Sequence, residues 1–265
     1  MAHEQKRLTL WQGKVETEIE VSGEGPPLLY LHGPWGLAPD LPFIAQLAAG
    51  HKVFAPRHPG TTNGAPNAAH AIDTLWDLVV YYGELMDRLE LKTAALIGHS
   101  FGGMVAAEIA AAMPERARCL VLIDPVGLWR DDHPVKNWMI MPEVARPQAL
   151  FAHPESEPAR RFFAHPEDKD ARVGSVVAFI WAQACTGKYV WPLPDKGLKH
   201  RIHRIAAPTL IVWGKQDGVV APVYAEEFAA RIRGSRSELI DGAGHLPHLE
   251  RSEEVAKLVR QFLAA

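Results

Sequence analysis

The stretch that most constrains this chain is 94–106, which reads AALIGHSFGGMVA. It begins with a short apolar run typical of a buried strand and ends in an alanine-rich helical pattern. Between the two, Ser100 has a glycine two residues before it and another two residues after it, which is the G-x-S-x-G pattern of a nucleophile elbow. Glycines are needed there because the turn is too tight for larger neighbours. The flanking strand and helix patterns make the match specific, and we predict that Ser100 is a nucleophile.

Length, charge and cysteine content exclude several classes of protein. A chain of 265 residues can form one large domain, with or without an insertion. The net charge of −3 comes without a basic stripe, so we expect no nucleic-acid partner. Two cysteines, Cys119 and Cys185, do not make a disulfide framework. Residues 1–10 lack the apolar core of a signal peptide, and no apolar run has the length of a membrane span. We therefore expect a cytoplasmic protein with no membrane partner.

Apolar runs typical of strands alternate with amphipathic patterns typical of helices. This alternation predicts an α/β fold with a mostly parallel central sheet flanked by helices. The first two strands, joined by a turn at 12–14, predict an antiparallel hairpin at the edge of that sheet. The expected strands are 9–11, 15–21, 28–31, 52–55, 94–97, 119–123, 209–213 and 237–240, and the expected helices are 41–49, 72–89, 223–232 and 253–263.

The rhythm changes over 126–204, where strand patterns vanish and prolines, histidines and aromatics become frequent. We predict a helical lid here, inserted after the sixth strand into a core formed by 1–125 and 205–265. Its aromatic side chains can line an apolar substrate pocket over Ser100, or they can simply pack the lid onto the sheet. The pocket candidates are Trp129, Trp138, Phe179, Trp181 and Trp191.

Three chemically active residues follow predicted strands. Ser100 follows 94–97, Asp217 follows 209–213, and His245 follows 237–240. Because parallel strands end at a common edge, we expect these side chains to meet. A serine hydroxyl needs a base to take its proton, and histidine titrates in the useful range. A carboxylate then holds the imidazole in the correct tautomer and stabilises its cationic form. His248 is the competing histidine, three residues further on.

This chain resembles the α/β-hydrolases, in particular the serine-nucleophile branch that includes esterases and lactonases. The motifs that carry the resemblance are His32-Gly33, the elbow around Ser100, Gly214-x-x-Asp217 and Gly244-His245, in the family's chain order of Ser, Asp and His. The resemblance covers nearly the whole chain. It implies an acyl-enzyme on Ser100, a small-molecule ester as substrate, and no metal or organic cofactor. His32 and His99 match the family's support positions.

Two assignments stay open. Asp124, at the end of the strand 119–123, is an alternative to Asp217 as the acid, because some relatives place their acid there. For the oxyanion hole, one donor should be the backbone N–H of Phe101. The second usually comes from the residue after His-Gly, but here that residue is Pro34, which has no N–H. We expect Trp35 to donate instead.

The preferred function is hydrolysis of carboxylic esters. Lactonase, carbon–carbon bond hydrolase and cofactor-free perhydrolase or haloperoxidase activities are alternatives on the same site, and a non-enzymatic ligand receptor is a further alternative. Carbon–carbon bond hydrolases usually carry Asn before the nucleophile and an aromatic residue after the catalytic histidine. This chain has His99 and Leu246 there, which argues against that branch. Its natural substrate, acyl chain length and oligomeric state do not follow from these patterns.

Overall fold

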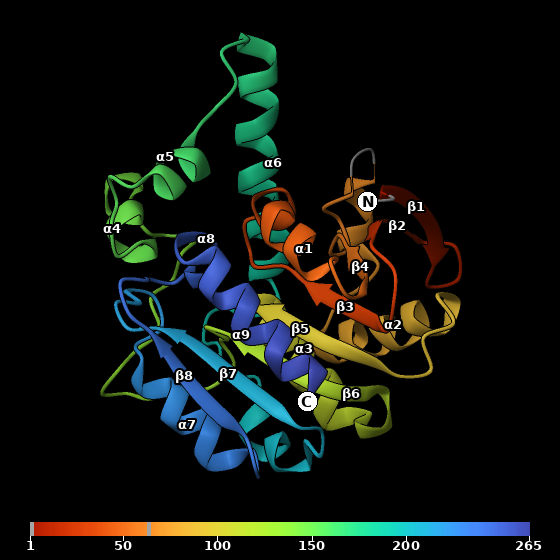
Figure 1. The fold of residues 1–265 in the computed structure, drawn as a ribbon. Coiled ribbons are helices and arrows are strands. Elements are labelled where there is room, and N and C mark those ends of the chain that lie inside the picture. Colours follow the sequence, from red (N-terminus) through yellow and green to blue (C-terminus); the bar gives the residue numbers. More distant parts are fainter. Residues whose placement is uncertain (1–2, 63–64) are drawn as a thin grey trace.

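The computed structural model describes residues 3–62 and 65–265, and its centre is an eight-stranded sheet (Figure 1). The strand order is β1-β2-β4-β3-β5-β6-β7-β8. Only β2 runs against its neighbours, pairing antiparallel with β1 and β4, whereas the other pairs are parallel. The predicted mostly parallel sheet with an antiparallel edge is therefore confirmed. The strands are β1 His3–Leu10, β2 Val15–Ser22, β3 Pro27–Leu31, β4 Lys52–Pro56, β5 Ala94–His99, β6 Ala117–Ile123, β7 Thr209–Gly214 and β8 Arg236–Ile240.

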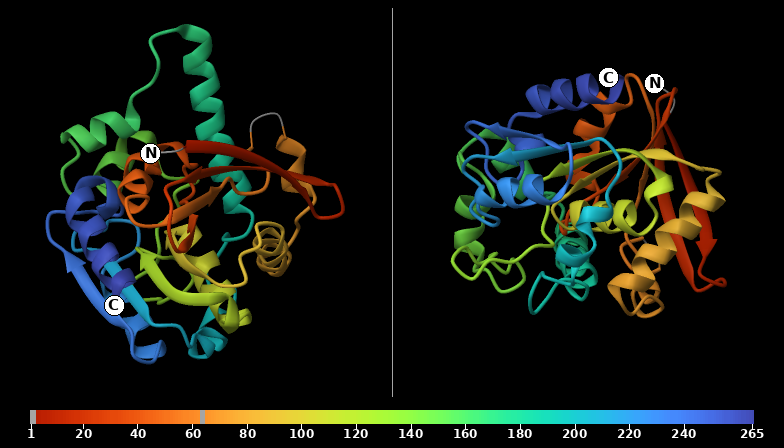
Figure 2. Two further views of the ribbon diagram at one scale, coloured as in Figure 1. Left: turned by 45° about the vertical axis from the view of Figure 1, so that its right-hand side comes forward. Right: turned by 90° about the horizontal axis from the view of Figure 1, so that it is seen from below.

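Helices cover both faces of the sheet, as the views in Figure 2 show. Side chains alternate along a strand, so Leu28 and Tyr30 of β3 enter one apolar core while Leu29 and Leu31 enter the other. Helices α1 and α9 cover the first core, and α2, α3 and α7 cover the second. Their bounds are α1 Leu41–Leu47, α2 Leu75–Arg88, α3 Phe101–Ala112, α7 Val223–Arg231, α8 Pro247–Glu250 and α9 Ser252–Ala264.

Two expected boundaries are wrong for identifiable reasons. Strand β1 begins at His3 rather than at residue 9, because it pairs with β2 along its whole length through mostly polar residues that hid the strand pattern. Arg7 of β1, for instance, forms ion pairs with Glu16 and Glu18. Helix α2 begins three residues later than expected, because the Thr74 side chain caps its first turn in a capping box.

The chain between β6 and β7 is helical. It contains α4 Arg146–Leu150, α5 Glu157–Phe163 and α6 Lys169–Gly187. Helix α6 stands out from the body in Figures 1 and 2, and its buried residues lie in its C-terminal part, from Ala182 onward. A bidentate pair between Arg201 and Glu108 of α3 joins the end of this segment to the core. The helical content agrees with the prediction for 126–204, whereas its role as a lid stays a prediction.

Short 3₁₀ turns connect these elements. Among the described residues, no helix is both long enough and apolar enough to span a membrane. The carboxyl ends of β3, β5, β6, β7 and β8 all lie at one edge of the sheet, because these strands are parallel. That edge carries the residues of the candidate site. The 3₁₀ turns are η1 Ala38–Asp40, η2 Pro66–His70, η3 Pro114–Arg116, η4 Glu143–Ala145, η5 Leu198–His200 and η6 Ile202–Arg204.

Candidate active site

The turn at Ser100 has the geometry of a nucleophile elbow. Ser100 has φ 52° and ψ −113°, a backbone conformation that residues other than glycine rarely adopt. A Cβ on Gly98 would lie 2.2 Å from the Gly102 carbonyl oxygen, and a Cβ on Gly102 would lie 2.1 Å from the Leu31 carbonyl oxygen. Glycines are therefore required at both positions for β5 to turn directly into α3. The turn places the Ser100 side chain at the carboxyl edge of the sheet.

Ser100, His245 and Asp217 form one hydrogen-bonded chain. Ser100 Oγ lies 2.9 Å from His245 Nε2, and His245 Nδ1 lies 2.7 Å from Asp217 Oδ2. Asp217 Oδ1 accepts hydrogen bonds from the N–H groups of Val219 and Val220, at 2.7 and 2.9 Å. A carboxylate only accepts, so Nδ1 carries the imidazole proton and Nε2 is left to accept the serine proton. The arrangement can therefore activate a serine hydroxyl for attack on a carbonyl carbon.

The competing histidine, His248, pairs with Asp40, whereas Ser100 pairs with His245. His248 Nε2 lies 3.1 Å from Asp40 Oδ1, and the other oxygen of Asp40 accepts a hydrogen bond from the Tyr30 hydroxyl. His99, next to the serine, donates from Nε2 to the backbone carbonyl of His245 at 2.8 Å. Burial, then the charges of His248 and His245, hold the pKa of His99 well below its usual range, so the ring is neutral. His99 thus holds the loop of His245 in place.

A second pair of buried histidines supports the loop after β3. The His58 N–H donates to His32 Nε2, and His58 Nε2–H donates to the His32 carbonyl. His32 therefore carries its proton on Nδ1 and donates it to the Gly33 carbonyl, while the Tyr82 hydroxyl donates to His58 Nδ1. Burial lowers the pKa of His58 to about 4 and that of His32 well below its usual range. His58 lies in an irregular loop without periodicity, so sequence reasoning missed it.

The two expected oxyanion donors, Trp35 and Phe101, lie on opposite sides of Ser100 in the chain, and each packs against a buried histidine. Trp35 is nearly buried, and its ring centroid lies 5.7 Å from that of His245. Phe101 is the first residue of α3, where backbone N–H groups have no partner within the helix. Its ring packs edge-on against His58 at 4.9 Å. These contacts place both residues at the site, and their role as donors stays a prediction.

Asp124 lies close to both Asp217 and His245. One side-chain atom of each of Asp124, Asp217 and His245 lies within 4.8 Å of the other two. Asp217 makes the direct hydrogen bond to His245, whereas Asp124 Oδ1 accepts the Gly214 N–H at 2.9 Å. Burial, followed by the charge of Asp217, raises the pKa of Asp124 well above its usual value. Of the two candidate acids, Asp217 occupies the position next to the imidazole.

Comparison with known proteins identifies the family of this chain. Residues 28–258 match the model of a family described as "Alpha/beta hydrolase family". The chain belongs to the alpha/beta hydrolase family. A relative named monoacylglycerol lipase abhd6-B, from Xenopus laevis, is 29% identical over 92% of this chain and 77% of its own length. Another, 2-hydroxy-6-oxo-2,4-heptadienoate hydrolase of Pseudomonas putida, is 26% identical over 96% of this chain and 94% of its own.

A solved structure extends the similarity to the fold. The crystal structure of a membrane phospholipase A, described as a bacterial virulence factor, superposes with a TM-score of 0.77. The superposition covers 99% of this chain and 86% of the other at 20% sequence identity, so the likeness concerns the fold alone. The relatives named above are hydrolases, and they include an ester hydrolase and a hydrolase of a dienoate.

In this alpha/beta hydrolase, Glu250 joins the histidine loop to the inserted segment. Its Oε2 accepts from the N–H groups of Gly244, at 2.6 Å, and Ala152, at 3.2 Å, and its Oε1 accepts from the His153 N–H. Gly244 precedes His245, and Ala152 and His153 follow α4. One carboxylate on α8 therefore positions two loops that are far apart in the sequence. Nothing in the local sequence pattern distinguishes Glu250 from an exposed helical glutamate.

Three of the five pocket candidates lie in an aromatic cluster that begins at Trp35. The Trp35 ring packs 6.4 Å from Trp138 and 6.0 Å from Phe162. Trp138 in turn packs against Trp191 at 5.0 Å, and Phe162 packs against Phe179 at 6.1 Å. These rings reach the hydrolase's His245 through Trp35. Phe162, which belongs to α5, contacts Trp35 directly.

The other two pocket candidates lie apart from this aromatic cluster. Trp129 donates its indole N–H to Asp131, and Trp181 donates to the carbonyl of Gly60. Trp181 is 37% exposed and lies on the projecting helix α6. The structure therefore brings Trp138, Phe179 and Trp191 toward the site but not Trp129 and Trp181. Whether any of them contacts substrate stays a prediction.

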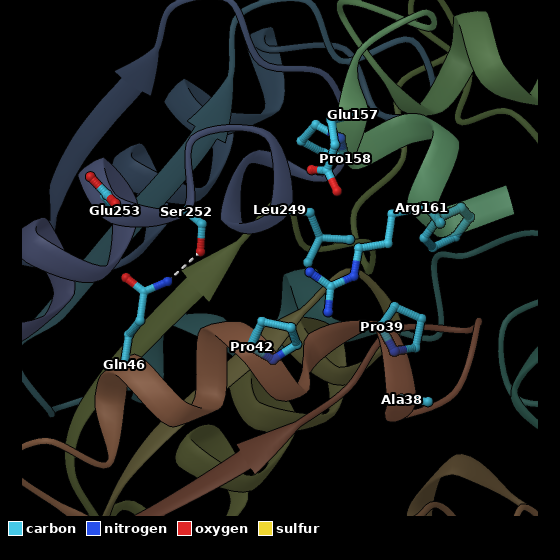
Figure 3. A pocket seen from close by; sticks show the side chains of 11 residues that line it. Ala38, Pro39, Pro42, Gln46, Glu157, Pro158, Arg161, Leu249, Ser252 and Glu253 are labelled. Atoms are coloured by element: carbon cyan, nitrogen blue, oxygen red, sulfur yellow. Dashed lines mark hydrogen bonds between the residues drawn. The ribbon is translucent and has the colours of Figure 1, made fainter. Parts of the chain in front are cut away.

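A cavity of about 510 Å³ opens between the hydrolase core and α5 (Figure 3). Arg161 extends into it from α5, opposite Leu249 of α8. Phe162 lines the cavity and also contacts Trp35, whose ring packs against His245. Ser100 itself is fully buried. The lining residues are Ala38, Pro39, Pro42, Gln46, Glu157, Pro158, Arg161, Phe162, Leu249, Ser252 and Glu253.

Two groups of buried side chains have the composition of a metal site. Asp40, His99 and His248 form one, and Asp124, Asp217 and His245 form the other. In the first group His248 bonds Asp40 and His99 bonds a backbone carbonyl, while in the second His245 bonds Asp217. These hydrogen bonds account for the clustering without an ion. The expectation that the site works without a metal or organic cofactor stays a prediction.

Proposed function

We propose that this chain hydrolyses carboxylic esters through an acyl-enzyme on Ser100. The observation that carries the proposal is the hydrogen-bonded chain from Asp217 through His245 to Ser100 Oγ. His245 takes the hydroxyl proton as Ser100 Oγ bonds to the carbonyl carbon, and then gives that proton to the departing alcohol. Water next attacks the acyl carbon and loses its proton to His245, which gives it to Ser100 Oγ as the bond to the acyl group breaks and the carboxylic acid leaves. Asp217 stabilises the imidazolium in both steps.

The oxyanion is proposed to bind to two backbone N–H groups, those of Phe101 and Trp35. Pro34 occupies the position from which the second donor usually comes, and it has no N–H. The neutral His32 and His58 support this proposal, because His32 donates to the Gly33 carbonyl and His58 donates to the His32 carbonyl, just before Trp35 in the chain. A single missing oxyanion donor costs roughly 10²–10³ in rate.

Substrate is proposed to arrive through the cavity of Figure 3, beneath the segment 126–204 acting as a lid. Ser100 is buried, so an ester reaches it only when Phe162 or Trp35 moves aside. The aromatic cluster of Trp138, Phe179 and Trp191 then borders the acyl or alcohol group. The proposed substrate is a small-molecule ester, and the protein is proposed to work in the cytoplasm.

Two assays test the ester proposal. A fluorophosphonate probe should label the native protein, and p-nitrophenyl esters of increasing chain length should be hydrolysed. Both reactions should be lost in Ser100→Ala, with turnover falling by about 10⁴ or more. Ser237→Ala, an exposed serine on β8, should retain both. Turnover that survives in Ser100→Ala would contradict the proposal.

Carbon–carbon bond hydrolysis is the second candidate. The dienoate hydrolase of Pseudomonas putida, 26% identical over nearly the whole chain, favours it. His99 before the nucleophile and Leu246 after the histidine argue against it. The comparison of kcat/KM for a 2-hydroxy-6-oxo-dienoate, a lactone and a p-nitrophenyl ester decides between these activities. Labelling of Ser100 without turnover of any of them would favour a ligand receptor.

A further inference from the structure

We infer that Asp124 is a positioning residue that holds a proton against Asp217, so that the two carboxyl groups carry one negative charge, which faces His245. The inference rests on the proposed function, since it concerns the acid that supports the imidazole. Asp124 acts through Asp217 and does not contact substrate.

The backbone holds Asp124 in a constrained position. It follows β6, and its φ of 43° lies in the left-handed region that asparagine and aspartate tolerate better than most residues. Its own N–H donates to the Val212 carbonyl of β7 at 3.0 Å, and its Oδ1 accepts the Gly214 N–H at 2.9 Å. The side chain is fully buried, so these bonds direct it toward the loop that carries Asp217.

The second oxygen of Asp124 identifies where the proton lies. Oδ2 is buried and accepts no hydrogen bond from any donor in the described part of the chain. One carboxyl oxygen of Asp124, one of Asp217 and one ring nitrogen of His245 lie within 4.8 Å of one another. Two buried carboxyl groups this close repel each other when both are ionised, which favours a proton on one of them. A proton on Oδ2 turns an orphaned acceptor into a donor to Asp217.

The neighbouring groups decide which of the two carboxyls is ionised. Asp217 receives the N–H groups of Val219 and Val220 and the Nδ1–H of His245, and all three favour its charged form. The side chains of both residues are buried, but Asp124 accepts a single backbone N–H, so the cost of burying its charge is offset less and its neutral form is favoured. Glu250, on α8, is a further negative group whose charge also raises the pKa of Asp124.

This arrangement makes Asp124 a reserve carboxylate. When Asp217 is replaced by a neutral residue, the charge that kept Asp124 protonated is removed. Asp124 can then ionise within 4.8 Å of the histidine atoms and stabilise the imidazolium in its place. Asp217→Asn should therefore lose about 10² in kcat/KM, whereas loss of an orienting aspartate costs about 10⁴ in serine hydrolases that lack such a reserve.

Asparagine is the matched replacement, because its oxygen can accept the Gly214 N–H while its NH₂ donates to Asp217. Asp124→Asn should lower kcat/KM by less than about tenfold, with the acid limb of the pH–rate profile unmoved. If Asp124 were ionised in the native protein, Asp124→Asn would remove a negative charge close to His245. The acid limb of the pH–rate profile would then move to lower pH by about two units. A shift of that size would overturn the inference.

A double-mutant cycle separates this role from a merely structural one. Asp124→Asn should cost about 10² in the Asp217→Asn background, bringing the double variant to about 10⁴ below the native protein. A structural role would cost the same factor in both backgrounds. Equal factors would therefore overturn the inference.

Infrared spectroscopy tests the proton without relying on activity. At pH 7 the native protein should show the C=O band of a buried carboxylic acid, and Asp124→Asn should lose it. Glu108→Gln is the matched control and should keep the band, because Glu108 is buried but held by the Arg201 guanidinium. An unchanged band in Asp124→Asn would overturn the inference. Activity that survives in Ser100→Ala would instead overturn the proposed function and leave the band's result valid.

Discussion

Acid should destabilise this protein through the buried histidines beneath the site, and His58 offers a quantitative test. Burial lowers the pKa of His58 to about 4, against 6.5 for an exposed histidine. As the pH falls below 6.5, the unfolded chain binds a proton at His58 that the folded chain excludes. The free energy of unfolding is therefore fully retained above pH 6.5 and falls as the pH approaches 4.

The size of the effect follows from the difference in pKa. A difference of about 2.5 pH units corresponds to about 3 kcal/mol lost between pH 6.5 and pH 4 for His58 alone. The lowered pKa values of His32 and His99 act in the same direction, so the native protein should lose more than this. His58→Gln keeps an oxygen for the Tyr82 hydroxyl and an N–H for the His32 carbonyl, but it cannot bind the proton. It should reduce the pH-dependent loss by about 3 kcal/mol.

Urea unfolding followed by tryptophan fluorescence, at intervals from pH 7 to pH 4, measures this loss. His58→Gln should be less stable than the native protein at pH 7 by about 1–2 kcal/mol, because its hydrogen bonds are imperfect, and should lose less on acidification. His200→Gln removes an exposed imidazole and should retain the native pH dependence. If His58→Gln lost stability with acid as steeply as the native protein, the argument from burial would be refuted.

Three further predictions concern the elbow, the inserted segment and the cavity. Gly102→Ala places a Cβ 2.1 Å from the Leu31 carbonyl oxygen and should cost at least about 3 kcal/mol, seen as a lower Tm. Arg201→Met leaves the buried Glu108 carboxylate without its guanidinium, and it should lower the free energy of unfolding in urea by about 3–5 kcal/mol. The double variant Arg201→Met, Glu108→Leu should regain most of that stability. Phe162→Ala opens the cavity toward the site and should raise kcat/KM for long p-nitrophenyl esters at least about threefold relative to the acetate.

Each of these has a clear contrary result. A Gly102→Ala protein with native Tm would mean that the turn relaxes at little cost. If adding Glu108→Leu destabilised the Arg201→Met protein further, the unpaired carboxylate would not be the cause of the lost stability. Equal changes in kcat/KM for short and long esters would mean that Phe162 does not control access.

The parts of the fold that could be predicted are those that short or periodic sequence patterns specify. The strand–turn–helix at Ser100 was predictable because a Cβ at Gly98 or Gly102 would lie about 2 Å from a backbone oxygen. The turn therefore requires glycines, and they are visible in the sequence. Strand β1 was not, because polar residues such as Arg7 pair across to β2 and give no apolar signal. The start of α2 depended on a capping box at Thr74 rather than on the apolar period.

The residues of the candidate site also divide into those that could be predicted from the sequence and those that could not. His245 and Asp217 were predictable because each follows a strand of a parallel sheet, and such strands end together. His58, Asp40 and Glu250 were not, because each acts through a hydrogen bond to a residue distant in the chain. Their local sequences are those of an ordinary loop histidine and ordinary surface carboxylates.

The sequence by itself determined the fold, the chain order of the site and the edge of the sheet at which Ser100, Asp217 and His245 meet. It favoured Asp217 as the acid but left Asp124, at the end of the adjacent strand, as an alternative. Only the tertiary structure distinguished them, because it directs Asp217 to His245 and Asp124 to the Gly214 N–H. The physical reason is that a carboxyl group's charge depends on how many donors surround it and how far it lies from water, and both are set by segments that meet only in the folded chain.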